Sequence, residues 1–274
     1  MHKTDTPPYI VQDVARAILQ SSQPEDKCKK AHALKSAWDK GTLVISNTPP
    51  AGLPCSPGRP DRPELVAPKD VKRRRPGSKA GRVALLHAIA HIEFNAINLA
   101  ADMLARFSHS PRIAESARQD FVSDWIGVCD DEARHFQMIS RRLEDLGSFY
   151  GALPAHNGLW EAAIDTAHDL AARLAIAPMV LEARGLDVTP GMIDRLKSAG
   201  DSESADILTI IYEEEIHHVA AGVRWFSHIC RREDKSVKGR FKSLLQAHYK
   251  GTLKPPFNTK ARTQAGLLQT YYSG

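Results

Sequence analysis

From residue 82 onward the sequence is dominated by long stretches with helical periodicity and few interior breakers. The stretch RVALLHAIAHIEFNAINLAADMLARF (82–107) contains no proline and ends at the turn SHSP, which predicts one long helix. A second helix is predicted from Pro111, a residue type that suits a first helical turn, to Gly147, which suits a helix C-cap. A third helix is predicted over residues 159–187.

The third stretch contains Pro178, which predicts a kink or a local irregularity. TPGMIDRLKSAG (189–200) predicts a short connecting helix, and a fourth long helix is predicted over 202–233, with Asp201 and Ser202 as candidate N-caps. No convincing stretch with the alternation of a strand accompanies them. Four long helices with short or moderate connections pack naturally as a four-helix bundle, so the predicted fold class is all-α.

The remaining sequence predicts extensions on both sides of this bundle. The first forty residues carry the periodicity of two short amphipathic helices. Residues 43–77 hold eight of the seventeen prolines, which excludes a helix or a central strand and predicts an extended arm. A short basic helix and a tail follow the fourth long helix. The predicted division is therefore 1–78 for the N-terminal helices and arm, 79–235 for the bundle and 236–274 for the C-terminal part.

Composition excludes several classes of protein. Hydrophobic residues make up 42% of the chain and charged residues 25%, which excludes a largely disordered chain. No uninterrupted apolar run approaches the roughly 20 residues of a membrane helix, and the start MHKTDTPPYI lacks the apolar core of a signal peptide. We therefore expect a cytoplasmic protein without a membrane segment. The four cysteines form no CxxC pair, which predicts free thiols rather than disulfides or a cysteine-ligated zinc site.

Two Glu-x-x-His pairs lie in the middle of predicted helices. Glu132 and His135 belong to the second helix, and Glu215 and His218 to the fourth. A spacing of three residues places both side chains of a pair on one face, about a turn apart, so that both can reach one ion. His217 competes with His218, because it has the same spacing from the preceding glutamate. We favour His218, because its apolar neighbours then fall in the core.

Two further glutamates lie alone in apolar stretches of the other long helices. Glu93 lies in AHIEFNAI and Glu182 in APMVLEARG. Several carboxylates that converge in a core need compensating positive charge, which two divalent cations would supply. Lone glutamates alternating with Glu-x-x-His pairs are the ligand pattern of dimetal carboxylate bundles. The predicted metal ligands are Glu93, Glu132, His135, Glu182, Glu215 and His218. The alternative is a set of surface carboxylates with ordinary core histidines.

Other side chains are candidates for contacts behind the ligands. Metal-bound histidines usually donate their second ring proton to a carboxylate. Asp131 and Glu214 precede the two pairs in the same register, so we expect Asp131 to orient His218 and Glu214 to orient His135. The alternative is that both belong to ordinary acidic helix stretches. Tyr212, one turn before the second pair, is a candidate for a hydrogen bond near the site or for packing alone.

Nearly the whole chain resembles the bacterial ferritin-like proteins of the domain-of-unknown-function 455 group. The likeness lies in AHIEFNAINLA, DDEARHF, LWEAAIDTAHDLAARLAIAPMVLEARGLDVTP and EEEIHHVAAGVRWF. The resemblance implies a ferritin-like bundle with a dimetal site on the residues named above, and it leaves the reaction open. Asn98 stands where similar sequences tend to carry a glutamate. At superfamily level the chain is also similar to tRNA-hydroxylating diiron monooxygenases.

The atom types of the predicted ligands limit which metals the site can bind and which reactions it can support. Oxygen and nitrogen ligands without a thiolate suit iron or manganese, and two such ions can bind O2 or peroxide. We therefore expect two Fe ions, two Mn ions or a mixed Fe/Mn pair in an O2- or peroxide-dependent oxidoreductase, an oxidase or hydroxylase whose small-molecule substrate the sequence does not identify. One alternative is a ferroxidase or a peroxide-scavenging protein. Another is a non-enzymatic helical interaction protein, and metal content separates it from the other two.

The net charge of +5 is unevenly distributed. Residues 69–82 hold seven basic residues and one acidic residue, so the pI of 9.0 is attributed to this segment. Its proline-rich setting and the lack of aromatic residues for base stacking favour a solvated connector over a nucleic-acid surface. A homodimer formed through exposed helical faces is a further expectation for a bundle of this kind.

Overall fold

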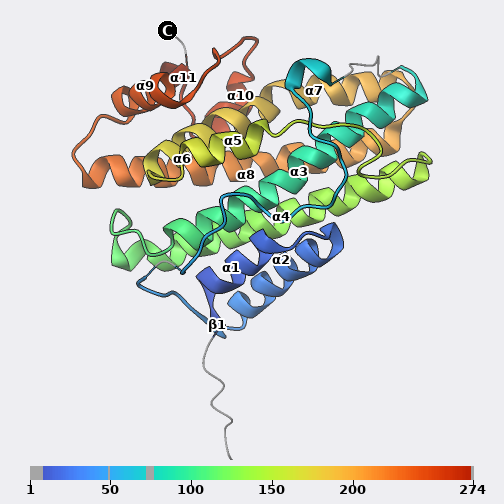
Figure 1. Ribbon diagram of the computed structural model, residues 1–274. Coiled ribbons are helices and arrows are strands. Elements are labelled where there is room, and N and C mark those ends of the chain that lie inside the picture. The colour runs from blue at the N-terminus through green and yellow to red at the C-terminus, as the bar shows by residue number, and fades with distance from the viewer. Residues whose placement is uncertain (1–8, 49, 72–76, 273–274) are drawn as a thin grey trace, which may run out of the picture. The chain divides into compact units, whose positions relative to one another are not determined.

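The structure, a computed structural model, describes residues 9–48, 50–71 and 77–272 and is an all-α helical bundle, which confirms the predicted fold class (Figure 1). The long helices are α3 (Lys79–Phe107), α4 (Arg118–Asp145) and α8 (Ser202–Arg232). The shorter helices are α1 (Val11–Gln20), α2 (Pro24–Asp39), α5 (Gly158–Asp165), α6 (Leu170–Ile176), α7 (Ala183–Ser198), α9 (Val237–His248), α10 (Thr259–Gln264) and α11 (Gln269–Tyr272). Within the described residues, the strands are limited to β1 (Tyr9–Ile10) and β2 (Leu43–Val44), which pair in parallel.

The chain divides into two compact units, and the division falls inside α3 and α4. Unit 1 comprises Met1–Pro60 with Ile97–Ala133, and unit 2 comprises Asp61–Ala96 with Arg134–Gly274. Each unit therefore contains a part of both long helices. The predicted division at residues 78 and 235 stays a prediction.

In unit 1, α1 and α2 are the two amphipathic helices predicted for the start of the chain, and they pack side by side (Figure 1). The buried residues of α1 include Val11, Ala15 and Ile18, at spacings of four and three residues. The proline-rich arm is fixed on the end of α1, because the N–H of Gly58 donates to the Leu19 carbonyl at 2.8 Å. A side chain at position 58 would collide with the α1 backbone, so this approach requires glycine.

Lys27 of α2 is fully buried in unit 1. Its Nζ donates to the carbonyl oxygen of Ile18 (2.8 Å) and to Asn98 Oδ1 (2.7 Å) and lies 3.3 Å from the carbonyl oxygen of Leu19. Asn98 therefore accepts a hydrogen bond from a buried lysine at the position where similar sequences tend to carry a glutamate. Burial lowers the pKa of Lys27 from its ordinary value of 10.5 to about 7.

Replacing this lysine is expected to change how stability depends on pH. Between pH 7 and 10.5 Lys27 is neutral in the folded protein but still protonated in the unfolded chain, so the unfolded state binds one more proton. The free energy of unfolding of the wild type should therefore rise relative to that of Lys27→Met as the pH increases from 7 to 10. Urea unfolding of both proteins at several pH values measures this difference. Lys30→Met, which removes an exposed lysine of α2, should show no such trend, and a flat difference for Lys27→Met would contradict the shifted pKa.

In unit 2, the helices differ from those predicted over residues 159–187 and 189–200. The helix predicted over 159–187 is interrupted between α5 and α6, where Asp169 acts as the N-cap of α6 and accepts hydrogen bonds from the N–H groups of Ala171 and Ala172. This side chain competes with the backbone for hydrogen bonds, which the periodicity does not reveal. The connecting helix predicted over 189–200 is instead the end of α7, which continues through Pro190 while packed along α8.

The second predicted helix begins later than expected, whereas the predicted caps at Gly147 and Asp201 are confirmed. Ala114 is extended, with ψ of 140°, so α4 starts at Arg118 after a 3-10 turn (η2, Glu115–Ala117) and not at Pro111. Gly147 ends α4 with a φ of +70°, as predicted. Asp201 is the N-cap of α8 and accepts a hydrogen bond from Ser204, which confirms one of the two candidates.

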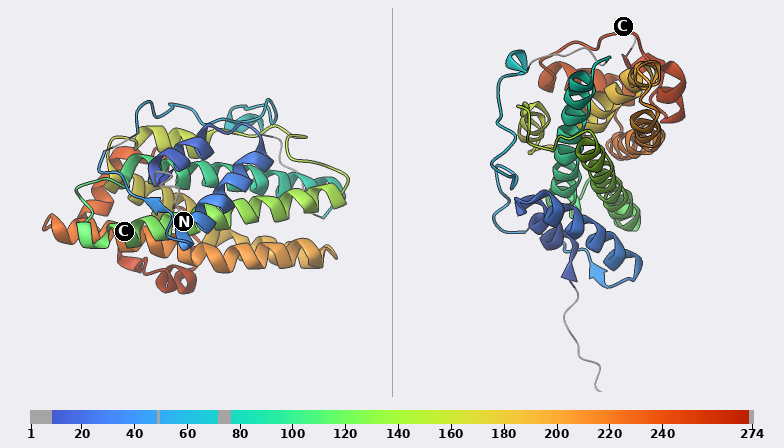
Figure 2. Two further views of the ribbon diagram at one scale, coloured as in Figure 1. Left: turned by 90° about the horizontal axis from the view of Figure 1, so that it is seen from below. Right: turned by 90° about the vertical axis from the view of Figure 1, so that its right-hand side faces the viewer.

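The C-terminal part of unit 2 is more ordered than the predicted tail. The helices α9 and α10 lie against α8, as both views of Figure 2 show, and α11 packs on α9. The predicted short basic helix corresponds to α9, whereas α10 and α11 lie in the segment predicted as a tail.

One helix passes a length and composition test for a membrane span. α3 (Lys79–Phe107) is long and apolar enough on average, although polar residues interrupt it, and 72% of its apolar window is buried inside the protein. Burial of this extent is typical of the core helix of a soluble protein. The apolar character of α3 is thus accounted for by packing.

Candidate metal centre

Four of the six predicted ligands meet in the interior of the protein. They are Glu93 from α3, Glu132 and His135 from α4, and Glu215 from α8, and one potential ligand atom of each lies within 4.8 Å of the others. Glu93 is 3% exposed, Glu132 and His135 are fully buried, and Glu215 is half-buried. The pair on α4 shares one face of the helix because its members are three residues apart.

His135 has a different partner at each ring nitrogen. Its Nε2 lies 2.6 Å from a carboxylate oxygen of Glu214 on α8, and its Nδ1 lies 3.3 Å from a carboxylate oxygen of Glu93. Because the Glu214 carboxylate can only accept, the Nε2 proton points toward it, and Nδ1 faces the cluster. A histidine held in this way binds a metal through Nδ1 when the metal replaces any proton there, while a carboxylate holds its other nitrogen.

Arg134 fixes the Glu214 carboxylate and was missed by the sequence analysis. Its Nη2 donates, at 2.7 Å, to the same Glu214 oxygen that accepts from His135. Burial alone would raise the pKa of Glu214, but the hydrogen bonds from Arg134 and His135 outweigh it, and the pKa lies below its ordinary value. Arg134 and Glu214 each precede a predicted ligand by one residue on their helices, so the position of Arg134 in the sequence was the signal for its role.

The other two predicted ligands lie outside the group of four. His218 is buried, with its Nδ1 3.7 Å from the Glu215 carboxylate and its ring centroid 5.8 Å from that of His135. His217, the competing candidate, is exposed. Glu182 is half-buried at the end of the π-helix η3.

The remaining candidates differ in where they point. Asp131 is half-buried on α4, and its predicted contact with His218 stays a prediction. The hydroxyl of Tyr212 accepts a hydrogen bond from Asn258 Nδ2 at 2.9 Å, so its polar group is used to fix the C-terminal segment on α8. Of the two carboxylates expected to orient the histidines, Glu214 contacts its predicted partner, His135.

A π-helix carries Glu182. This segment, η3 (Ala177–Glu182), contains Pro178, so the irregularity predicted at that proline is confirmed. Across from it, Gly222 of α8 leaves the space that the ring of Pro178 occupies, since a Cβ at position 222 would lie 2.5 Å from Pro178 Cβ. The role of this glycine cannot be read from the sequence, because its partner, Pro178, lies on another helix.

Gly222→Ala is expected to destabilise the protein by about 1–3 kcal/mol, because the added methyl group must displace the π-helix or α8. Urea unfolding measures the change. Gly185→Ala on α7 is the matched control, since nothing lies within 4 Å of a Cβ there and the higher helix propensity of alanine should stabilise. Equal effects of the two substitutions would contradict the proposed close packing at Gly222.

The donor set of the cluster fits a metal ion. Three carboxylates gathered within 4.8 Å in a mostly buried site repel one another, and a bound cation would relieve that repulsion. Carboxylate oxygens with one imidazole and no thiol are the donors that iron and manganese accept readily. The arrangement can therefore hold a metal ion of this kind.

The fold and the site together define a helical-bundle protein with a buried carboxylate and histidine cluster. The chain belongs to the family described as "Protein of unknown function (DUF455)", whose model matches residues 20–273 and confirms the predicted membership of this group. It is 38% identical over 254 residues to a protein of Haemophilus influenzae described as uncharacterized, covering 92% of this chain and 88% of that relative. No solved structure matches the chain significantly.

Proposed function

We propose that this chain is a ferritin-like dimetal protein that holds two Fe ions, two Mn ions or a mixed pair and acts as an O2- or peroxide-dependent oxidoreductase on a small molecule in the cytoplasm. The observation that carries the proposal is the convergence of four ligand atoms within 4.8 Å on three helices. A buried cluster of three carboxylates is costly to maintain and serves no packing purpose, which favours a cation-binding role.

Each residue of the site has a distinct task in this proposal. Glu93, Glu132, Glu215 and His135 would hold the metal, with Glu182 and His218 completing the set predicted from sequence. Glu214, itself fixed by Arg134, keeps the proton of His135 on Nε2 and so leaves Nδ1 as the ligand atom. When bound, a pair of such ions supplies the capacity to bind and reduce O2 or peroxide.

The test is metal content, measured by elemental analysis of protein purified without oxygen. We expect about two Fe or Mn ions per chain, as in the dimetal carboxylate bundles. A variant with Glu132→Ala and Glu215→Ala should lose them, whereas Glu213→Ala, which removes an exposed carboxylate of α8, should retain them. No metal above background after reconstitution with Fe(II) and Mn(II) would contradict the proposal and favour the helical interaction protein.

A second measurement separates the oxidoreductase from the iron-handling alternatives. Metal-loaded protein is supplied with O2 or peroxide, and consumption is followed with and without excess Fe(II). Turnover that needs only Fe(II), or that removes peroxide with a simple reductant, would favour a ferroxidase or a peroxide scavenger. Consumption that depends on an added organic substrate supports the proposed reaction class.

A further inference from the structure

The C-terminal part of the chain is strongly basic. From residue 235 to the end of the sequence there is no aspartate or glutamate, and eight basic residues are present: Lys235, Lys238, Arg240, Lys242, Lys250, Lys254, Lys260 and Arg262. The pI of 9.0 is therefore a property of two segments, which corrects its attribution to residues 69–82 alone. Residues 72–76, the centre of that first segment, lie outside the described residues.

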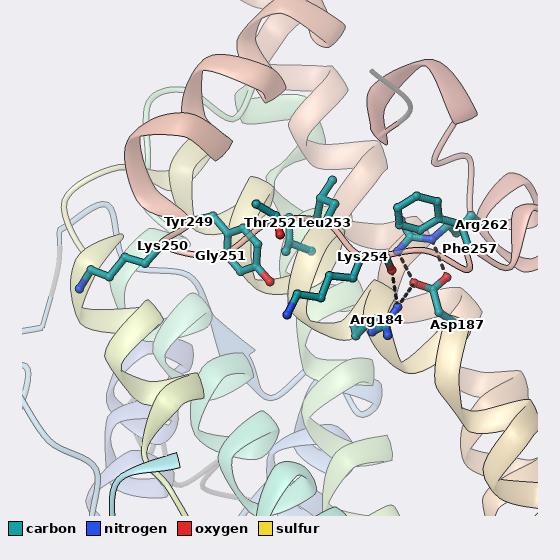
Figure 3. Close-up of a pocket in the computed structure, with 11 residues that line it drawn as sticks. Arg184, Asp187, Tyr249, Lys250, Gly251, Thr252, Leu253, Lys254, Phe257 and Arg262 are labelled. Atoms are coloured by element: carbon teal, nitrogen blue, oxygen red, sulfur yellow. Dashed lines mark hydrogen bonds and ion pairs between the residues drawn. The ribbon is translucent and has the colours of Figure 1, made fainter. Parts of the chain in front are cut away.

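Part of this basic segment forms one wall of a cleft in unit 2. The segment from Tyr249 to Arg262 and the helix α7 enclose a cavity of about 380 Å³ (Figure 3). Cavities that bind small organic molecules start at roughly this size. Val180 of the π-helix also lines it, two residues from Glu182.

The charges that line the cleft are mostly positive. Among the described residues around it, Arg184, Lys250, Lys254 and Arg262 are basic and Asp187 is acidic. Arg262 holds both oxygens of Asp187, at 2.8 and 2.7 Å, and Arg184 Nη1 donates to one of them at 3.3 Å, so these two arginines and one aspartate keep one surplus positive charge. Lys250, at the rim, lies 3.3 Å from Asp165. The positive charge of the cleft thus comes from the arginine that Asp187 leaves uncompensated and from Lys254.

The hydrogen bonds around the cleft hold its walls together. Arg184 Nη1 donates to the Lys254 carbonyl at 2.7 Å, as the dashed line in Figure 3 marks. Asn258 donates its N–H to Asp187 Oδ1 at 3.0 Å and its side-chain amide to the Leu186 carbonyl and the Tyr212 hydroxyl. The positions of the basic groups are therefore set by contacts with α7 and α8 rather than by the loop alone.

We propose that this cleft binds a small organic oxyanion, a phosphate or a carboxylate with an apolar part. A guanidinium donates to such groups through paired N–H bonds, and an ammonium adds a point charge. Arg184 and Lys254 supply these groups, and Thr252 contributes a hydroxyl. The ring of Tyr249 offers a flat surface for the apolar part. The described residues that line the cleft include none of the predicted metal ligands, so this proposal does not depend on the proposed function.

Calorimetric titration of the full chain tests the proposal, with phenyl phosphate, benzoate and the neutral benzyl alcohol as probes. We expect saturable one-to-one binding of at least one anionic probe, weakening with added salt, and no binding of benzyl alcohol. Phenyl phosphate and benzoate distinguish a phosphate site from a carboxylate site. Binding of neither anion at millimolar concentration would overturn the proposal, as would equal binding of the neutral probe.

Two variants locate the site. Lys254→Gln and Arg184→Gln should each raise the dissociation constant for the anionic probe about tenfold or more, because each removes one charge-assisted hydrogen bond. Lys242→Gln, which removes the same charge from the exposed part of α9, should leave it within about twofold, a change too small to signal a lost contact. An equal loss in Lys242→Gln would show that only overall charge matters and would overturn the proposal. Circular dichroism checks the fold of each variant, and Lys254→Gln keeps the backbone carbonyl that Arg184 contacts.

Failure of the anion-binding proposal can be distinguished from failure of the metal proposal by exchanging the variants between the two tests. The variant with Glu132→Ala and Glu215→Ala should bind the anionic probe as the wild type does, and Lys254→Gln should retain its metal. Loss of anion binding in the metal-site variant, with its fold intact, would contradict the separateness of the two sites.

Discussion

Glu132→Gln is expected to lower the metal content at least about tenfold, because it weakens the coordination of the metal. It is also expected to raise the free energy of unfolding of the metal-free protein. The second effect arises because Glu132 is fully buried within 4.8 Å of two other carboxylate ligand atoms. Like charges at this distance repel by about 3–4 kcal/mol at an effective dielectric constant near 20. The glutamine keeps the shape of the side chain and removes one charge. Binding sites commonly trade stability for function in this way.

Urea unfolding with a chelator and with added metal measures both effects. The wild type should gain more stability than Glu132→Gln when metal is added, because only binding to the folded state stabilises. Glu213→Gln is the control, since this exposed carboxylate of α8 should change neither quantity. If Glu132→Gln were less stable than the wild type without metal, the carboxylate would have a structural role instead, as in an ordinary hydrogen-bonded core.

The long helices could be predicted because their apolar periodicity persists over many turns. Their interruptions could not, since each depends on one local detail: the extended Ala114 delays α4, and the side chain of Asp169 ends one helix and starts another. The opposite error occurred at Pro190, where packing of α7 along α8 overrides the tendency of proline to start a new helix.

The same limit applies to the candidate site. The Glu-x-x-His spacing is a property of single helices, so the pairs on α4 and α8 could be identified from sequence. Gly222 and Arg134 act on partners in other helices, and Lys27 reaches Asn98 across 71 positions of sequence. Such contacts between elements become visible only when the packing is known.

Asp187→Ala is expected to destabilise unit 2 by about 3–5 kcal/mol. The Asp187 carboxylate is fully buried and accepts two hydrogen bonds from Arg262, whose side chain is 2% exposed. Removal of the carboxylate leaves a buried guanidinium without its counter-charge. Arg262 also lies over the rings of Phe257 and Tyr272, so displacement of its guanidinium should loosen the segment that carries these rings. Urea unfolding measures the loss, and limited proteolysis after residue 248 detects local release of this segment.

A double-mutant cycle with Arg262→Ala tests whether the charge left behind is the cause. The double variant should cost less than the sum of the two single variants, because neither buried charge then remains alone. Asp39→Ala breaks a surface ion pair with Lys35 and should cost less than about 1 kcal/mol, since both side chains are more than a third exposed. Additive single effects, or a cost for Asp187→Ala as small as that of Asp39→Ala, would contradict the view that this pair anchors the C-terminal segment on α7.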